Sequence, residues 1–196
     1  MGCYSSGMEP VLLDLPETLE TERLILRPPR AGDGAAVNAA ILETWDSLQQ
    51  WMAWAIERPP VDETEGHMRR QHASWVARTG LNMLLFARDT QAFVGAAGIP
   101  RLDWGLRRFE IGYWIRRSCE GQGLMCEAVT ALTQFAFTTL AAVRVEIHTS
   151  HRNVRSQRVA ERCGFVLEGR LRDFAREPNG ELRDEMIYGR VRSAQA

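Results

Sequence analysis

The segment from Arg107 to Ala128, RRFEIGYWIRRSCEGQGLMCEA, carries the most informative pattern in the chain. Its apolar residues alternate with other residues from Phe109 to Ile115, which is the period of a half-buried β-strand. A Gly121-Gln122-Gly123 turn follows, and from Leu124 onward apolar residues recur at helical spacing. The segment therefore predicts a strand, a glycine turn and the start of a helix.

This turn is a candidate anion-binding site. Two glycines let the backbone approach a pyrophosphate without a Cβ clash, and the N-terminus of the following helix adds partial positive charge. The turn lacks the Lys-Ser/Thr of a nucleotide P-loop and the third glycine of a dinucleotide fingerprint. A diphosphate cofactor bound without magnesium fits this pattern, and a plain strand-to-helix connection is the alternative.

Length and composition predict one domain and exclude several partners. The chain has 196 residues, of which 45% are hydrophobic, so it can bury one sizeable core. The formal net charge of −1 gives no case for nucleic acid or an anionic membrane as a partner. All 24 basic residues are arginines, whose planar guanidinium suits phosphate, and the chain has no lysine of its own to acylate.

The cysteines and the N-terminus predict a protein of the reducing cytoplasm. Cys3, Cys119, Cys126 and Cys163 show no C-x-x-C spacing and no companion histidines, so we expect neither a metal site nor a disulfide scaffold. No apolar run approaches the roughly 18 residues of a membrane span. The start of the chain fits an N-myristoylation pattern, but a loosely ordered leader over residues 1–20 is the simpler account, with the domain over residues 21–192.

The hydrophobic pattern predicts eleven elements after the leader, in the order β-α-α-β-β-β-α-β-α-β-β. The strands are expected at 24–26, 83–87, 92–99, 109–115, 143–147, 165–167 and 185–188, and the helices at 34–48, 63–79, 124–140 and 154–162. Asp33, Asp62 and Asn153 are the expected helix caps, and Gly164 is expected to end the last helix. This order predicts an α/β fold with a mixed, mostly antiparallel central sheet and helices on both faces.

Three of the six tryptophans, Trp45, Trp51 and Trp54, lie just before a Pro59-Pro60 break. Large aromatic side chains beside such a break either close the core or form the wall of a substrate cleft. We take Trp51 and Trp54 as candidate substrate-binding residues.

In the order and spacing of its motifs the chain resembles the GNAT superfamily of acyl-CoA-dependent N-acetyltransferases, and within it the Rim-type ribosomal-protein N-terminal acetyltransferases. The resemblance covers about Thr21 to Arg190. It rests on TERLILR at 21–27, EIGYWI at 110–115, GQG at 121–123, Glu127-Ala128, Asn153, Ser156, Gly164-Phe165 and Glu168-Gly169.

The resemblance implies acetyl-CoA as cosubstrate and a set of residues that bind it. The amides around Gly121 to Met125 would bind the pyrophosphate, Trp114 to Arg116 would pair with pantetheine, and Asn153 would anchor the pantetheine arm. The implied cofactor-binding residues are Trp114, Ile115, Arg116, Gly121, Gln122, Gly123, Leu124, Met125, Asn153 and Ser156. Arg152, Arg155 and Arg158 are further candidates for the phosphates, or else part of a charged surface.

Two positions depart from the family pattern. Ser118 stands where relatives often have Arg or Gln, which removes one phosphate donor. Ala160 stands where many relatives have the tyrosine that protonates the leaving thiolate, so Ser156 is our candidate for proton delivery or for a cofactor hydrogen bond.

Acyl transfer also needs a base, because an α-amine with a pKa near 8 is largely protonated at neutral pH. Glu110 matches the general-base glutamate of part of the superfamily, and a cross-strand salt bridge with an arginine is the other reading. A cysteine relay through Cys126, which lies in the first helical turn, is the alternative chemistry.

These residues predict an N-acetyltransferase that acts on a primary amine, most simply the N-terminal α-amine of a protein or peptide. A small-molecule amine such as an antibiotic is the alternative acceptor, and a non-catalytic acyl-CoA sensor is the rival from another functional class. Exposed strands near the C-terminus, with Met186, Ile187 and Tyr188, suggest a homodimer.

Overall fold

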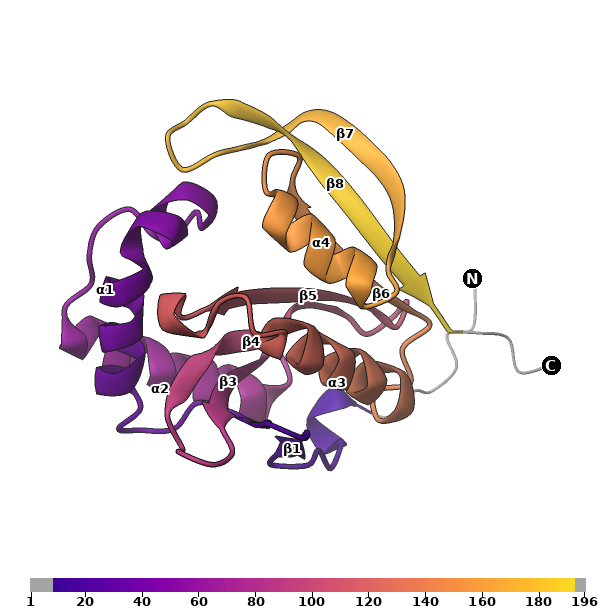
Figure 1. Ribbon diagram of the computed structural model, residues 1–196. Helices are drawn as coiled ribbons and strands as arrows, with labels where there is room; N and C mark the ends of the chain where they lie inside the picture. The colour runs from indigo at the N-terminus through magenta and orange to yellow at the C-terminus, as the bar shows by residue number, and fades with distance from the viewer. Residues whose placement is uncertain (1–8, 193–196) are drawn as a thin grey trace.

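The computed structural model describes residues 9–192, which form one sheet of eight strands with four α-helices packed around it (Figure 1). The strands are β1 Leu19–Glu20, β2 Leu24–Arg27, β3 Leu81–Ala87, β4 Phe93–Asp103, β5 Arg108–Ile115, β6 Arg144–Ser150, β7 Val166–Arg176 and β8 Leu182–Val191. The helices are α1 Gly34–Trp51, α2 Val61–Ala77, α3 Leu124–Thr138 and α4 Val154–Arg162, and short 3₁₀ turns occupy Pro10–Leu12 and Arg117–Cys119.

The sheet order is β1-β2-β3-β4-β5-β6-β8-β7, and every neighbouring pair is antiparallel except β5 and β6. The parallel pair follows from the α3 crossover between those two strands, as parallel strands require. The predicted α/β fold with a mixed, mostly antiparallel sheet and helices on both faces is confirmed.

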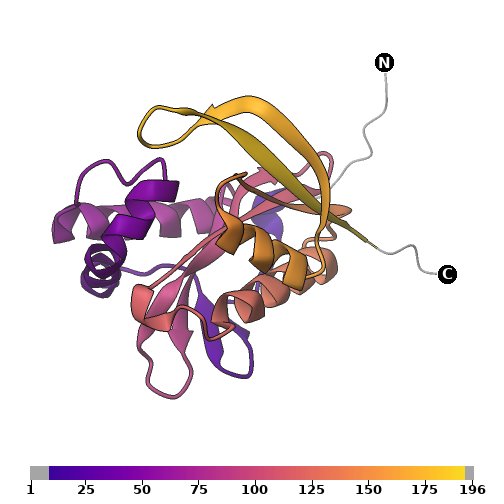
Figure 2. The same ribbon diagram turned by 45° about the horizontal axis from the view of Figure 1, so that its top comes forward.

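Two helix layers cover the sheet, and Figure 2 shows them on opposite sides of the strands. Buried side chains of α3, such as Leu132, pack with Ile111 and Ile147 of the sheet, whereas those of α1, such as Ile41, pack with Leu84. Alternation along each strand explains the division, because successive side chains point to opposite faces.

Strands β5 and β6 separate soon after they begin to pair. Their register covers Arg108 with Arg144, Phe109 with Val145 and Glu110 with Glu146. β5 then continues to Ile115 and β6 to Ser150 with no further pairing between the two. Backbone groups of β5 beyond Glu110 are therefore free, on this side, to bond to a ligand.

The predicted elements are present with shifted ends. The prediction that Asp62 caps α2 is wrong, because the helix begins at Val61 and Pro60 is its N-cap residue. Asp33 precedes α1 but makes no capping bond, since its carboxylate accepts bonds of 2.8 and 2.7 Å from Arg27. Asn153 does cap α4, by accepting a 3.1 Å bond from the Ser156 N–H.

The last two strands are much longer than predicted. β7 is an edge strand that is exposed along most of its length, so its sequence shows little apolar alternation. Pairing with β8 stabilises it where the local pattern is weak. In both views the tip of the β7–β8 hairpin points toward the side of the molecule that carries α1 (Figures 1 and 2).

Within the described part of the leader, β1 pairs with β2, and Leu15 and Leu19 pack against the core. The N-myristoylation pattern and Cys3 lie outside the described residues. Across residues 9–192, no helix combines the length and the apolar character needed to cross a membrane.

Candidate active site

Two cavities meet at β5. The larger, about 610 Å³, lies between the separating strands β5 and β6 and is walled by residues of α1, α3 and α4. The smaller, about 480 Å³, lies between the α1–α2 layer and strands β3 to β5. Both are lined by Met52, Gly112, Tyr113 and Trp114. The two cavities therefore adjoin each other along this short stretch of β5.

The glycine turn forms one end of the larger cavity. Gly121 and Gly123 both adopt the left-handed conformation, with φ of +76° and +79°, which favours glycine. Gly123 is the N-cap residue of α3, and no side chain caps that helix, so first-turn N–H groups remain available to a ligand. The turn and the start of α3 contribute Gly121, Gly123, Leu124 and Met125 to the cavity wall.

An ion pair far apart in the sequence holds this turn in place. The Glu127 carboxylate of α3 accepts bonds from the Arg23 backbone N–H at 2.8 Å and from Arg23 Nε at 2.7 Å. A second nitrogen of the same guanidinium, Nη1, donates to the Gln122 carbonyl at 2.9 Å. Burial raises the pKa of Glu127, but hydrogen bonds from Thr21 and Arg23 outweigh it and lower the pKa overall. These contacts connect the start of the domain, at Thr21 and Arg23, to the glycine turn and α3.

Arginines surround the larger cavity, although not all of the predicted ones. Arg155 and Arg158 line it, together with Arg162 and Arg183, which sequence reasoning did not single out. Arg152 instead pairs with Glu181 at 2.7 Å.

Two more predicted cofactor residues lie outside both cavities. Arg116 pairs with Glu43 of α1 at 2.6 Å, and the same carboxylate accepts a 2.9 Å bond from the Ser118 N–H. Gln122 donates through its side chain to the Ser118 carbonyl. Arg116 and Gln122 thus shape the turn between β5 and α3, and neither lines a cavity.

The remaining predicted cofactor residues, Trp114, Ile115, Asn153 and Ser156, line the larger cavity. The Ser156 hydroxyl lies 2.9 Å from the Tyr113 hydroxyl, which also donates to the Ser156 carbonyl at 3.1 Å. Burial raises the pKa of Tyr113 well above its ordinary value, so the phenol keeps its proton. The alternation in the sequence placed Tyr113 on the core face of β5. A buried phenol needs a hydrogen-bond partner, and by that need Tyr113 could have been identified from the sequence as a site residue.

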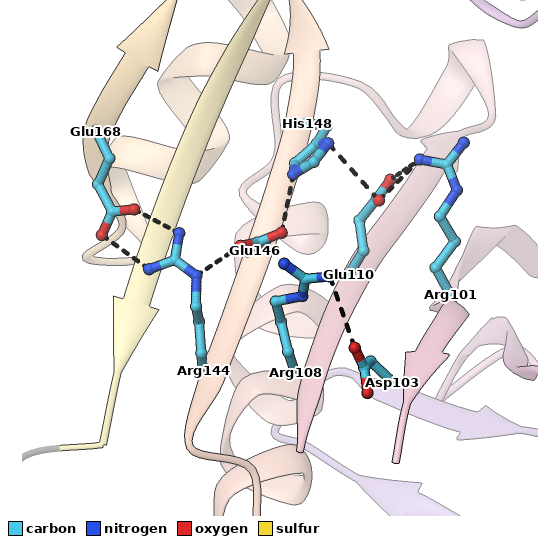
Figure 3. A network of polar contacts seen from close by, with 8 residues as sticks. All are labelled: Arg101, Asp103, Arg108, Glu110, Arg144, Glu146, His148 and Glu168. Atoms are coloured by element: carbon cyan, nitrogen blue, oxygen red, sulfur yellow. Dashed lines mark hydrogen bonds and ion pairs between the residues drawn. The ribbon is translucent and has the colours of Figure 1, made fainter. Parts of the chain in front are cut away.

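Glu110 lies on β5 two residues before Gly112, where the two cavities adjoin. Its carboxylate accepts bonds of 3.1 and 2.8 Å from Arg101 of β4, and its side chain is 17% exposed (Figure 3). The cross-strand salt bridge therefore exists. Glu110 lines neither cavity, but Gly112, two residues along on the same face, lines both.

The tryptophans and cysteines fall into different environments. Trp51 lines the larger cavity and Trp54 the smaller one, whereas Trp45 of α1 is buried in the core. Cys126 lines the larger cavity. Cys163 is buried, and burial raises the pKa of its thiol to about 12, which suits a packing role. Among the described residues no three His, Cys, Asp or Glu side chains gather as a metal site would require.

Comparison with known proteins agrees with this geometry. Residues 23–166 match the family described as the acetyltransferase (GNAT) domain. YdaF of Bacillus subtilis, named as a candidate ribosomal N-acetyltransferase, is 31% identical over 172 residues, which cover 85% of this chain and 90% of YdaF. The ribosomal-protein-serine acetyltransferase of Escherichia coli is 28% identical over 155 residues, covering 78% and 83% of the two chains.

Among solved structures, the ribosomal L7/L12 α-N-protein acetyltransferase RimL in complex with coenzyme A superposes with a TM-score of 0.83 at 25% identity. The match covers 91% of this chain and all of that one. The family match spans well over half of the chain, and the protein belongs to the GNAT family of acetyltransferases.

Proposed function

We propose that this enzyme transfers the acetyl group of acetyl-CoA to the N-terminal α-amine of a protein or peptide. The observation that carries the proposal is the meeting of two cavities at Gly112 to Trp114, because acyl transfer requires a donor and an acceptor to approach one point from two sides. The larger cavity takes the acetyl-CoA, and the smaller takes the amine.

The residues of the larger cavity fit coenzyme A. The positive φ at Gly121 and Gly123 and the uncapped start of α3 suit the pyrophosphate. The unpaired edge of β5 at Trp114 and Ile115 suits the amide-bearing pantetheine arm, with Asn153 on the opposite wall. The bound cosubstrate supplies an activated thioester, and no metal is needed for that chemistry.

Two proton transfers are then assigned to residues of the chain. Glu110 accepts the proton that the ammonium must lose before it attacks, through a water beside Gly112, because Glu110 itself lines neither cavity. The Ser156 hydroxyl, oriented by Tyr113, gives its proton to the leaving thiolate and takes up the second proton that the amine nitrogen loses as the amide forms. Cys126 faces the same cavity without a role in this scheme.

The names of the relatives support a protein acceptor. YdaF and the Escherichia coli enzyme are named for ribosomal proteins, and RimL for an α-N-protein substrate. An acceptor of that kind would put this enzyme in the cytoplasm. Trp54 lines the smaller cavity, which supports a contact with the acceptor, whereas Trp51 lines the larger, donor cavity.

The test is an acetyl-CoA consumption assay over lysine-free peptides with different N-terminal residues, polyamines and aminoglycosides. We expect turnover with free N-termini and none with the same peptides blocked at the α-amine. Because the chain contains no lysine, self-acetylation at a side-chain amine cannot contribute to the signal. Turnover confined to polyamines or aminoglycosides would replace the peptide acceptor by a small molecule.

We also propose a homodimer, formed through β7 rather than through the residues named from the sequence. Tyr188 is only 1% exposed, and β8 lies between β6 and β7, so that segment is not an edge. β7 is the edge, and Phe174 on it is 60% exposed. Light scattering at micromolar concentration should give about twice the chain mass of 22.2 kDa. Phe174→Glu should lower that mass, and a monomer for the parent protein would remove the proposal.

A further inference from the structure

His148 of β6 lies between two carboxylates from adjacent strands (Figure 3). Its Nε2 is 3.0 Å from Glu146 Oε2, and its Nδ1 is 3.7 Å from Glu110 Oε2. The first contact is a hydrogen bond, and the second is an ion-pair distance that a shift of about 1 Å turns into a hydrogen bond. The parallel register of Glu110 with Glu146 brings the three side chains to one face of the sheet.

Glu146 determines which nitrogen of His148 is available. Burial raises the pKa of Glu146, but hydrogen bonds from Arg144 and His148 outweigh it and lower the pKa overall. An ionised carboxylate only accepts hydrogen bonds, so Nε2 carries a proton and donates it to Glu146. Neutral His148 then presents the lone pair of Nδ1 toward Glu110. Arg144 holds Glu146 in place and is itself held by Glu168 of β7.

His148 and Glu110 differ in their access to the cavities. His148 lines the larger cavity, whereas Glu110 lines neither cavity and is bound by Arg101. A reacting ammonium has three N–H bonds and the product amide has one. The departing thiolate takes up one of the two protons lost, so one proton must leave the enzyme in each turnover.

We propose that His148 takes from Glu110 the proton that Glu110 receives from the acceptor amine. This step rests on the proposed function. The amine gives a proton to the water beside Gly112 as that water gives one to Glu110, so an amine N–H bond breaks and the Glu110 O–H bond forms. That O–H bond then breaks as the Nδ1–H bond of His148 forms. The imidazolium then lies between two carboxylates, and it returns to neutral by losing its proton to water in the larger cavity.

The chemistry of the groups supports this direction of transfer. Carboxylic acids ordinarily have pKa values near 4.3, imidazoles near 6.5 and α-amines near 8. A proton taken from an amine is therefore held better by an imidazole than by a carboxylate alone. Histidine also releases protons close to neutral pH, as a group that must reset in every turnover requires.

Other charged groups face this site from the neighbouring strands. Arg101 faces Glu110 from β4, and Arg144 faces Glu146 from β6. Glu185 of β8 is buried, and burial raises its pKa, although its neighbours Arg183 and His148 lower it. Glu185 is thus a third carboxyl group close to His148, and its pKa is raised overall.

The test compares His148→Gln with His72→Gln in the acetyl-transfer assay from about pH 6 to pH 9. The glutamine amide of His148→Gln keeps a donor for Glu146 but cannot take a proton. We expect kcat/KM to fall roughly 10- to 100-fold near pH 6.5, with the loss shrinking as pH rises, because more acceptor then arrives as the neutral amine. His72 bonds to the Pro29 carbonyl and lines neither cavity, so its variant should keep parental rates.

Two further measurements separate proton transfer from support of the fold. Imidazole added to His148→Ala should restore part of the rate, with a dependence on the concentration of the neutral base. The double variant Glu110→Gln with His148→Gln should be no slower than Glu110→Gln alone, because the two residues act in one step.

A pH-independent loss, no response to imidazole, or additive losses in the double variant would each overturn the proposal. Absence of peptide acetylation by the parent protein would instead refute the proposed function, and the two failures are thus distinguishable.

Discussion

Glu110→Gln is expected to lower kcat/KM for a peptide acceptor by roughly 10²- to 10⁴-fold at neutral pH, with acetyl-CoA affinity unchanged. The amide has the size of the carboxylate but cannot accept the amine proton. The loss should shrink as pH rises, because at high pH more acceptor arrives already neutral. Rates measured from about pH 6 to pH 9, with acetyl-CoA binding followed by calorimetry, check both parts.

Controls separate the base from its ion-pair partner. Arg101→Gln removes the salt bridge to Glu110 without removing the carboxylate. If Glu110 acted only through this salt bridge, Arg101→Gln and Glu110→Gln would lower kcat/KM equally. Ser156→Ala removes proton delivery to the thiolate, and its loss should not shrink as the acceptor becomes neutral. Parallel pH profiles for Glu110→Gln and the parent protein, or parental activity in that variant, would leave the role to another group.

Gly123→Val is expected to weaken acetyl-CoA binding by about 100-fold or more. A branched Cβ both strains the positive φ of +79° and fills the space through which the turn's backbone reaches a phosphate. The added Cβ meets only Arg23 Nη2, at 3.6 Å, which is ordinary contact, so the rest of the fold should accept it. Calorimetric titration with acetyl-CoA and with free coenzyme A measures the effect.

Gly180→Val is the matched control. Gly180 has a similar φ of +88°, an added Cβ meets nothing within 4 Å, and the residue lies in the β7–β8 loop and lines neither cavity. Both variants place a branched side chain at a positive φ, so a loss of affinity confined to Gly123→Val identifies the phosphate turn. Unchanged affinity in a folded Gly123→Val protein would contradict the assignment of this turn.

Local patterns in the sequence predicted the central part of the fold. The strand from Arg108 to Ile115, the glycine turn and the start of α3 at Leu124 were all recognised. Strand alternation, the permissive backbone of glycine and helical spacing are properties of neighbouring residues, so no tertiary information is needed to read them. The same holds for the cap that Asn153 provides to α4.

The edge strand β7 could not be predicted at its full length from local sequence pattern. Much of β7 faces solvent on both sides, and its polar sequence becomes a strand only because β8 supplies hydrogen bonds along its length. Strand propensity depends on packing against neighbours, and those neighbours are absent from a local window. For this reason the homodimer prediction was based on residues 186–188, which lie in β8, and not on the exposed edge strand β7.

Tertiary structure also decided which candidate residues meet. Glu110 and Arg116 could be named from the resemblance, but only the sheet register brings Glu110 to Arg101 and His148, and only the packing of α1 brings Glu43 to Arg116. Tyr113 reaches Ser156 across 43 residues of sequence. The fold class, the glycine turn and the residue types that a GNAT enzyme needs could be predicted from the sequence, because those depend on local pattern. Their partners and their access to the cavities depend on strand pairing and helix packing between distant segments, which only the folded chain decides.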